Sequence, residues 1–199
     1  ALAVYGCVLG YDLIADEMKD KELSELVKRI GLVEGMPVVT NPGIIDPEKF
    51  ADEVINVRIP NPFMPDTPQR IATDTSQKVG IRYGETIKSY VAKDGSARAL
   101  TAIPLAIAGW CRYLLGIDDN GEAFELSPDP MADELKCQLD GIVWGESSSY
   151  TGQLKNLLSN ANIFGINLYE AGIGDKIEEM FVEEISGKGA IRETLKKYL

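Results

Sequence analysis

Apolar residues recur at helical spacing along most of the chain. The opening stretch, residues 1–14, carries apolar side chains three and four positions apart and predicts an amphipathic helix. A second such face over residues 21–30 predicts another helix. Asp46 followed by Pro47 is typical of a helix start, because Asp accepts from free backbone N–H groups and proline fits the first helical position. We expect this helix to run to about Val57.

Proline and glycine residues interrupt the helical pattern in the next part of the chain. Residues 36–45 are turn-rich and predict a loop with an extended stretch. Four prolines lie within residues 60–68, and a continuous helix cannot pass through them. A helical pattern returns over about 67–90, with Gly80 and Gly84 as the candidate break points.

Residues 97–116 form the most apolar stretch of the chain. They are long enough to cross a membrane, but Pro104 and Arg112 interrupt them and the flanks are not basic. They therefore predict a buried core helix, in which Arg112 is expected to pair with an acid. Further amphipathic helices are predicted over 130–144, 151–160, 174–186 and 188–198.

The pattern as a whole predicts an all-α fold, with residues 1–199 forming a single multi-helical, bundle-like domain. Alternating β patterns are scarce, and no strand–helix–strand spacing is present. The chain opens at Ala1 without Met, without a signal-peptide pattern and without an N-cap, in the middle of an apolar helical face. We interpret it as a domain of a longer polypeptide.

The charge balance restricts the classes of molecule that this chain is expected to bind. With 31 acidic and 20 basic residues the net charge is −11, and no basic stripe compensates for it. Such a surface repels phosphate backbones and anionic lipids, so neither nucleic acid nor a membrane is expected as a partner. A small anionic substrate is compatible with this charge only where a few cations gather in one pocket.

Cysteine and histidine content restricts the chemistry. Cys7, Cys111 and Cys137 form neither a CxxC motif nor an even set, so we expect reduced thiols and a cytoplasmic location. The chain contains no histidine. This excludes a Ser-His-Asp or Cys-His system and a histidine-based zinc site within these residues, and no metal is expected.

The segment NPFMPDTPQRIATDTSQK, residues 61–78, is the strongest candidate for a site. Arg70, Asp74 and Lys78 lie four positions apart and would share one face of a helix. On one interpretation they form a solvated salt-bridge ladder. On the other they form the lip of a pocket, in which the Arg fork and the Lys ammonium bind a ligand with several hydroxyls or a carboxylate.

Three other patterns favour structural roles. Residues 172–175, GIGD, lack the preceding strand of a dinucleotide fingerprint and predict a helix end followed by Asp175 as an N-cap. The acids of residues 118–122 lack the spacing of a calcium loop and predict a solvated turn. Trp110 beside Arg112 on an apolar helix predicts core packing.

Residues 61–78 resemble the substrate-domain signature of the mannitol dehydrogenase family, which includes mannitol 2-dehydrogenase, arabinitol dehydrogenase and fructuronate reductase (mannonate oxidoreductase). GCVLGYDLIADEMKD near the start, the apolar helix with its following loop, and the tail are also similar to that family, so the resemblance covers nearly all of the chain. The residues that meet the signature are Asn61, Pro62, Asp66, Thr67, Arg70, Ser76 and Lys78.

The resemblance implies a helical C-terminal domain like that of 6-phosphogluconate dehydrogenase. It implies that Arg70 and Lys78 bind substrate hydroxyls, with Asp74 between them as a further candidate. It places an NAD- or NADP-binding Rossmann domain, and a Lys-x4-Asn-x2-His catalytic motif, upstream of Ala1. No residue of this chain would then be catalytic, and the chain alone would be inactive. The substrate would be a small polyol or hexuronate.

Two alternatives remain open at this point. A stand-alone helical binding module is one, because the chain holds no complete catalytic set. A relative that acts on a sugar-alcohol phosphate is the other, because an Arg–Lys pair also suits phosphate.

Overall fold

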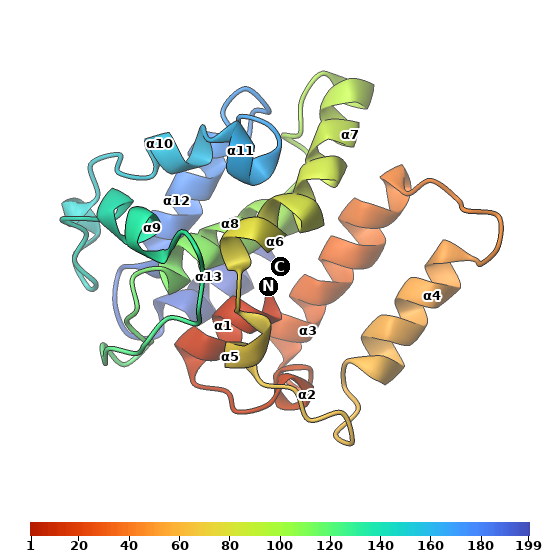
Figure 1. The fold of residues 1–199 in the computed structure, drawn as a ribbon, viewed down its shortest axis with the longest axis horizontal. Coiled ribbons are helices and arrows are strands. Elements are labelled where there is room, and N and C mark those ends of the chain that lie inside the picture. Colours follow the sequence, from red (N-terminus) through yellow and green to blue (C-terminus); the bar gives the residue numbers. More distant parts are fainter.

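The computed structural model describes residues 1–199, and it confirms the all-α prediction. The chain folds into helices joined by turns, with two isolated β-bridges and no strand. Figure 1 shows the helices around a central one, α8. In chain order the elements are α1 (Leu2–Leu9), α2 (Ile14–Glu17), α3 (Lys21–Lys28), η1 (Arg29–Gly35), η2 (Met36–Val38), α4 (Pro47–Glu53), η3 (Val54–Arg58), α5 (Pro68–Ile71), α6 (Thr75–Val79), η4 (Gly80–Gly84), α7 (Glu85–Asp94), α8 (Ala102–Tyr113), α9 (Ala132–Gln138), η5 (Ser147–Ser149), α10 (Lys155–Leu158), α11 (Ala161–Phe164), α12 (Gly174–Glu184) and α13 (Ala190–Tyr198).

Helix α8 is the core of the molecule. Every one of its residues is buried, as expected for a helix that is apolar all round. It packs against α12 and α1, and α12 in turn packs against α13. The prediction of a buried core helix within 97–116 is therefore confirmed, and no helix of the structure has the length and apolarity needed to span a bilayer.

Close contact between α1 and α8 depends on a glycine. A Cβ at Gly109 would lie 2.3 Å from the Tyr5 ring, so only glycine lets the ring lie against α8. The Tyr5 hydroxyl lies 2.8 Å from the carbonyl oxygen of Leu105 and 2.6 Å from Oε1 of Glu184. The one hydroxyl proton of Tyr5 is shared between these two acceptors, which ties α1 to both α8 and α12.

Arg112 corrects the prediction of an acid partner. Its guanidinium is fully buried and donates to backbone carbonyls, at 2.6 Å to Ile117, 3.0 Å to Asp118 and 3.3 Å to Glu184. The planar fork thus ties the loop after α8 to the end of α12 through neutral acceptors.

Several helix ends differ from the predictions. The first helix stops at Gly10, which has φ 76°, instead of continuing to residue 14. The helix predicted over 130–144 ends at Gln138, and that over 151–160 is reduced to α10. Asp175 lies inside the first turn of α12 and is not its N-cap. Helices α12 and α13 lie within the predicted ranges.

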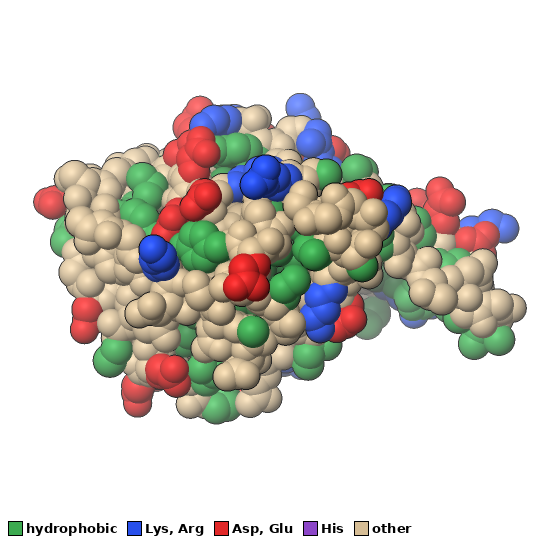
Figure 2. All heavy atoms as spheres, turned by 90° about the horizontal axis from the view of Figure 1, so that it is seen from above, with side chains coloured by type: hydrophobic (Ala, Val, Ile, Leu, Met, Phe, Trp, Pro, Cys, Tyr) green, Lys and Arg blue, Asp and Glu red, His purple; other side chains and the backbone are tan.

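Helix α4 and η3 form an arm beside α3 (Figure 1). Figure 2 shows the arm projecting to the right of the main body. Nearly all exposed large apolar side chains of the chain lie between residues 33 and 81, with Val143 as the exception. The most exposed are Phe63 at 91% and Ile44 at 87%. This side of the molecule therefore presents apolar surface to its surroundings.

Candidate functional site

The signature segment forms two short helices joined by a tight turn. Thr67 caps α5, because its hydroxyl accepts from the Arg70 N–H at 3.2 Å. The helix ends at Ile71, and α6 begins at Thr75. Asp74, between them, has φ 55° and is the one non-glycine residue with a positive φ. The expected common helical face is therefore absent, and the break lies here instead of at the later glycines.

A loop distant in sequence holds this turn in place. The Asp74 N–H donates to the carbonyl oxygen of Pro128 at 2.8 Å. Next to it, the Ser127 hydroxyl donates to the carbonyl oxygen of Gln69 at 2.7 Å. Residues 127–129, which we call the clamp loop, thus contact both helices of the signature segment.

Asp129 makes the main attachment of the clamp loop. Its Oδ2 accepts from the Ser76 N–H at 2.8 Å and from the Thr75 hydroxyl at 3.1 Å. Its Oδ1 accepts from the Ser76 hydroxyl at 2.5 Å and from the Met131 N–H at 2.9 Å. Partial burial raises the pKa of Asp129, but the hydrogen bonds outweigh it and the pKa is lowered overall. The carboxylate is therefore charged at neutral pH.

Arg70 projects into solvent beside an acid. Its side chain is 73% exposed, its Nε donates to Oδ1 of Asp66 at 2.5 Å, and its Nη2 pairs with Oδ2. The hydrogen bond with Asp66 raises the pKa of Arg70, and the same contact lowers the pKa of Asp66. The guanidinium is thus preoriented by a residue one turn earlier in the chain.

Lys78 turns back over the tight turn. Its Nζ donates to the carbonyl oxygen of Thr73 at 2.5 Å and lies 3.4 Å from that of Ile71. No carboxylate lies within ion-pair distance of this ammonium. The Asp74 carboxylate makes no hydrogen bond, so the three predicted site residues do not form the salt-bridge ladder.

Lys78 lines a cleft between α1, α3, η3, α6 and η4. The cleft has a volume of about 660 Å³ and is mostly apolar. Its polar lining comes from Thr75, Lys78, Arg82 and Tyr83, and no Asp or Glu belongs to it. Arg70 and Asp74 are not among the lining residues. Of the predicted site residues, the structure therefore places only Lys78 in the cleft.

Sequence reasoning missed the clamp loop and Arg82. The pair Asp129–Pro130 resembles an ordinary helix start, and Asp129 does accept from the N–H of Met131, just before α9. Nothing in the local pattern indicates that the same carboxylate reaches Ser76, 53 residues earlier. Arg82 could have been noticed as the next cation four positions after Lys78.

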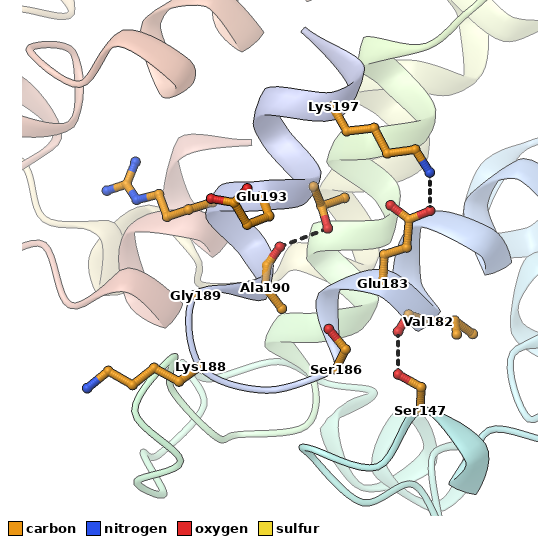
Figure 3. A pocket seen from close by; sticks show the side chains of 11 residues that line it. Ser147, Val182, Glu183, Ser186, Lys188, Gly189, Ala190, Glu193 and Lys197 are labelled. Atoms are coloured by element: carbon orange, nitrogen blue, oxygen red, sulfur yellow. Dashed lines mark hydrogen bonds and ion pairs between the residues drawn. The ribbon is translucent and has the colours of Figure 1, made fainter.

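A second hollow, between η5, α12 and α13, is less suited to chemistry (Figure 3). Lys197 points at Glu183 with Nζ at 2.5 Å, and the Ser147 hydroxyl donates to the carbonyl oxygen of Val182 at 3.0 Å. Arg192 and Glu193 also line this hollow, but their ion-pair partners, Asp20 and Lys196, lie outside it. No group of three or more Cys, Asp or Glu side chains is placed to hold a metal ion.

Comparison with known proteins identifies related sequences along the chain. Residues 1–185 match the family model of the mannitol dehydrogenase C-terminal domain. D-mannonate oxidoreductase from Thermotoga maritima is 55% identical over 198 residues, which are 99% of this chain and 36% of that protein. D-mannonate oxidoreductase from Escherichia coli is 31% identical over 135 residues, 68% of this chain and 27% of that protein. The chain spans about a third of the length of these relatives.

Solved structures share the fold. Mannitol 2-dehydrogenase from Pseudomonas fluorescens, in a ternary complex with NAD and D-mannitol, superposes with a TM-score of 0.82. The match covers 98% of this chain and 37% of that one at 22% identity. D-sorbitol dehydrogenase in substrate-free form gives a TM-score of 0.72 at 21% identity.

Proposed function

The chain belongs to the mannitol dehydrogenase C-terminal domain family, and on this basis we propose that it is the substrate-binding domain of an NAD- or NADP-dependent oxidoreductase. The rest of that enzyme would be an N-terminal Rossmann domain, in keeping with the 36% share of the Thermotoga maritima protein that the chain spans. The whole protein would act in the cytoplasm, where the three free thiols of this chain stay reduced.

A sugar acid is the substrate class that the cleft supports best. The chain carries a net charge of −11, yet the cleft wall holds Lys78 and Arg82 and no acid. Cations focused in an acid-free, largely apolar hollow attract a carboxylate more strongly than a neutral polyol. This observation carries the proposal, and it accords with the 55% identity to a D-mannonate oxidoreductase.

The residues of this chain would bind and orient the substrate. The Lys78 ammonium, which now rests on the Thr73 carbonyl, would exchange that acceptor for a substrate oxygen. Arg70, exposed and preoriented by Asp66, would reach the part of the substrate that lies outside the cleft. Fixing the reacting carbon in a near-attack geometry contributes several kcal/mol to catalysis, of order 7–11 kcal/mol in favourable cases.

The cofactor would be held mainly by the other domain. This helical chain has no strand and hence no strand–turn–helix unit with a glycine-rich phosphate loop. When bound, the nicotinamide supplies hydride transfer to or from the carbinol carbon. The proton-accepting group would also lie in the other part of the polypeptide, as the family resemblance implies.

The apolar surface between residues 33 and 81 supports a partner on this side. The cleft is lined mostly by apolar side chains, among them Leu2, Val27 and Ile55. The exposed Phe63 and Ile81 follow or precede lining residues closely in the chain. Covering such a surface is favourable at about 25 cal/mol per Å². We assign this face to contact with the N-terminal domain of the same polypeptide.

Steady-state kinetics of the full-length enzyme test the proposal. With NADH or NADPH, fructuronate is expected to give a higher kcat/KM than fructose. Lys78→Ala and Arg70→Ala should each lower kcat/KM by about 10-fold or more, with the Kd for the cofactor unchanged. Lys93→Ala, an exposed lysine on α7, is the matched control. Equal use of fructose would contradict the sugar-acid assignment, and wild-type kinetics in both variants would contradict the site.

A further inference from the structure

We propose that Asp129 is a positioning residue for the substrate site, because it fixes the tight turn and the start of α6, the helix that carries Lys78. The inference rests on the proposed function, because it assigns a role relative to the binding lysine. Asp129 touches neither the cleft nor the substrate side of Lys78. Its contacts are with the backbone and hydroxyls that determine where α6 begins.

Each oxygen of the Asp129 carboxylate accepts two hydrogen bonds. Each oxygen accepts from one backbone N–H, Ser76 on Oδ2 and Met131 on Oδ1, and from one hydroxyl. Hydrogen bonds to a charged acceptor are about twice as strong as neutral ones. The side chains of Thr75 and Ser76 are buried, so water cannot readily replace these bonds if the carboxylate is removed.

The attachment acts at the point where the backbone is strained. Asp74 holds a left-handed conformation, and its N–H is fixed by the carbonyl oxygen of Pro128, next to Asp129. Such a conformation persists only where surrounding contacts impose it. Loss of the Asp129 anchor would therefore let the turn relax toward ordinary backbone geometry.

Relaxation of this turn would displace Lys78 in two ways. The lysine lies two residues after Ser76 on the same short helix, so its stem moves with the start of α6. Its ammonium also rests on carbonyl oxygens of the turn itself, those of Thr73 and Ile71. Both ends of the side chain thus depend on the clamp, and a shift of about 1 Å at a reacting group can change the rate by about 100-fold.

A double-mutant cycle in the full-length enzyme separates positioning from general stability. Asp129→Ala should lower kcat/KM for the sugar acid by about 10- to 100-fold, with cofactor Kd within about twofold of wild type. The kcat/KM of Asp129→Asn should lie between those of the wild type and Asp129→Ala, because the remaining oxygen can still accept from Ser76. In the Lys78→Ala background, Asp129→Ala should reduce kcat/KM by less than about threefold, since coupled residues are not additive. Glu125→Gln removes an exposed charge near the clamp loop and should behave as wild type.

The outcomes distinguish the two claims. Full additivity of Asp129→Ala and Lys78→Ala would overturn the positioning role, as would wild-type kinetics in Asp129→Ala. Wild-type kinetics in Lys78→Ala would instead overturn the proposed site. Should Asp129→Ala fail to fold, Ser76→Ala removes only the hydroxyl contact and leaves the backbone one, and the same cycle with that variant decides the question.

Discussion

Oε1 of Glu34 accepts a hydrogen bond of 2.7 Å from the backbone N–H of Ala102, the first residue of the core helix α8. The same oxygen accepts from Thr101 N–H at 2.6 Å, and Oε2 accepts from Ile103 N–H at 2.8 Å. The first N–H groups of a helix have no carbonyl acceptor within the helix. The Glu34 carboxylate, 67 residues before Thr101, accepts from three of them. It also lies at the positive end of the helix dipole.

Substitution Glu34→Gln should destabilise the chain. One oxygen becomes an NH2 group that cannot accept, so at least one buried N–H loses its partner, and the charge at the helix end is lost. The expected loss is about 1–3 kcal/mol in the free energy of unfolding, measured by urea titration. Glu122→Gln, whose exposed side chain makes no hydrogen bond, is the control. A Glu34→Gln protein as stable as the control would contradict the capping role.

Replacement of Gly80 by Ala should also destabilise the fold, for a steric reason. A Cβ at Gly80, the first residue of η4, would lie 1.9 Å from the carbonyl oxygen of Ile163, so η4 and α11 must move apart. We expect a loss of about 1–3 kcal/mol, seen as a lower Tm. At Gly31 a Cβ would meet only the flexible end of Ile55, at 3.0 Å, and Gly31→Ala should be neutral or slightly stabilising. Equal Tm values for the two variants would contradict this account.

These contacts mark the boundary of what the sequence could predict. The helix start at Asp46 was predictable because its cap is local, with Oδ1 accepting from Glu48 N–H at 3.0 Å. The apolar run within 97–116 likewise identified the core helix. Gly80 was interpreted as a helix break, whereas it permits a close approach to a segment some 80 residues later, which no local pattern reveals.

The candidate site shows the same division. The spacing of Arg70 and Lys78 predicted one shared helical face, whereas the structure places them on two separate helices, α5 and α6, and only Lys78 lines the cleft. The turn between them was not predictable, because the N–H of its left-handed residue, Asp74, is held by the carbonyl oxygen of Pro128, a residue distant in sequence. Propensity within a window carries no information on such long-range contacts.

Stability should depend on pH through Glu184. Burial raises the pKa of this carboxyl to about 8, and the hydrogen bond from Tyr5 and the charge of Arg112 offset only part of that. The ordinary value is 4.5, so the folded state holds the proton more tightly. The stabilisation is therefore fully present below about pH 4.5 and is lost as the pH rises through about 8. Glu17, also buried with a pKa of about 8, adds to the same trend.

Unfolding by urea between about pH 5 and pH 8 measures this effect. The free energy of unfolding of the wild type minus that of Glu184→Gln should fall across the window by a few kcal/mol, because the amide does not titrate. Glu122→Gln should follow the wild type at every pH. Parallel curves for wild type and Glu184→Gln would show that Glu184 keeps the same charge in both states.

Asp74 allows conformation and binding to be separated. Asp74→Gly removes the left-handed strain, of about 1 kcal/mol, but raises the entropy of the unfolded chain by a similar amount, so the free energy of unfolding should stay within about 1 kcal/mol of wild type. Alanine adopts the left-handed conformation less readily than aspartate does. The free energy of unfolding of Asp74→Ala should therefore be about 1–2 kcal/mol lower than that of the wild type. If the free carboxylate contacts the substrate, both variants lose kcat/KM in the full-length enzyme, including the stable one. Wild-type kinetics in Asp74→Gly would remove Asp74 from the site and leave it a role in shaping the turn alone, since glycine reproduces the backbone without the carboxylate.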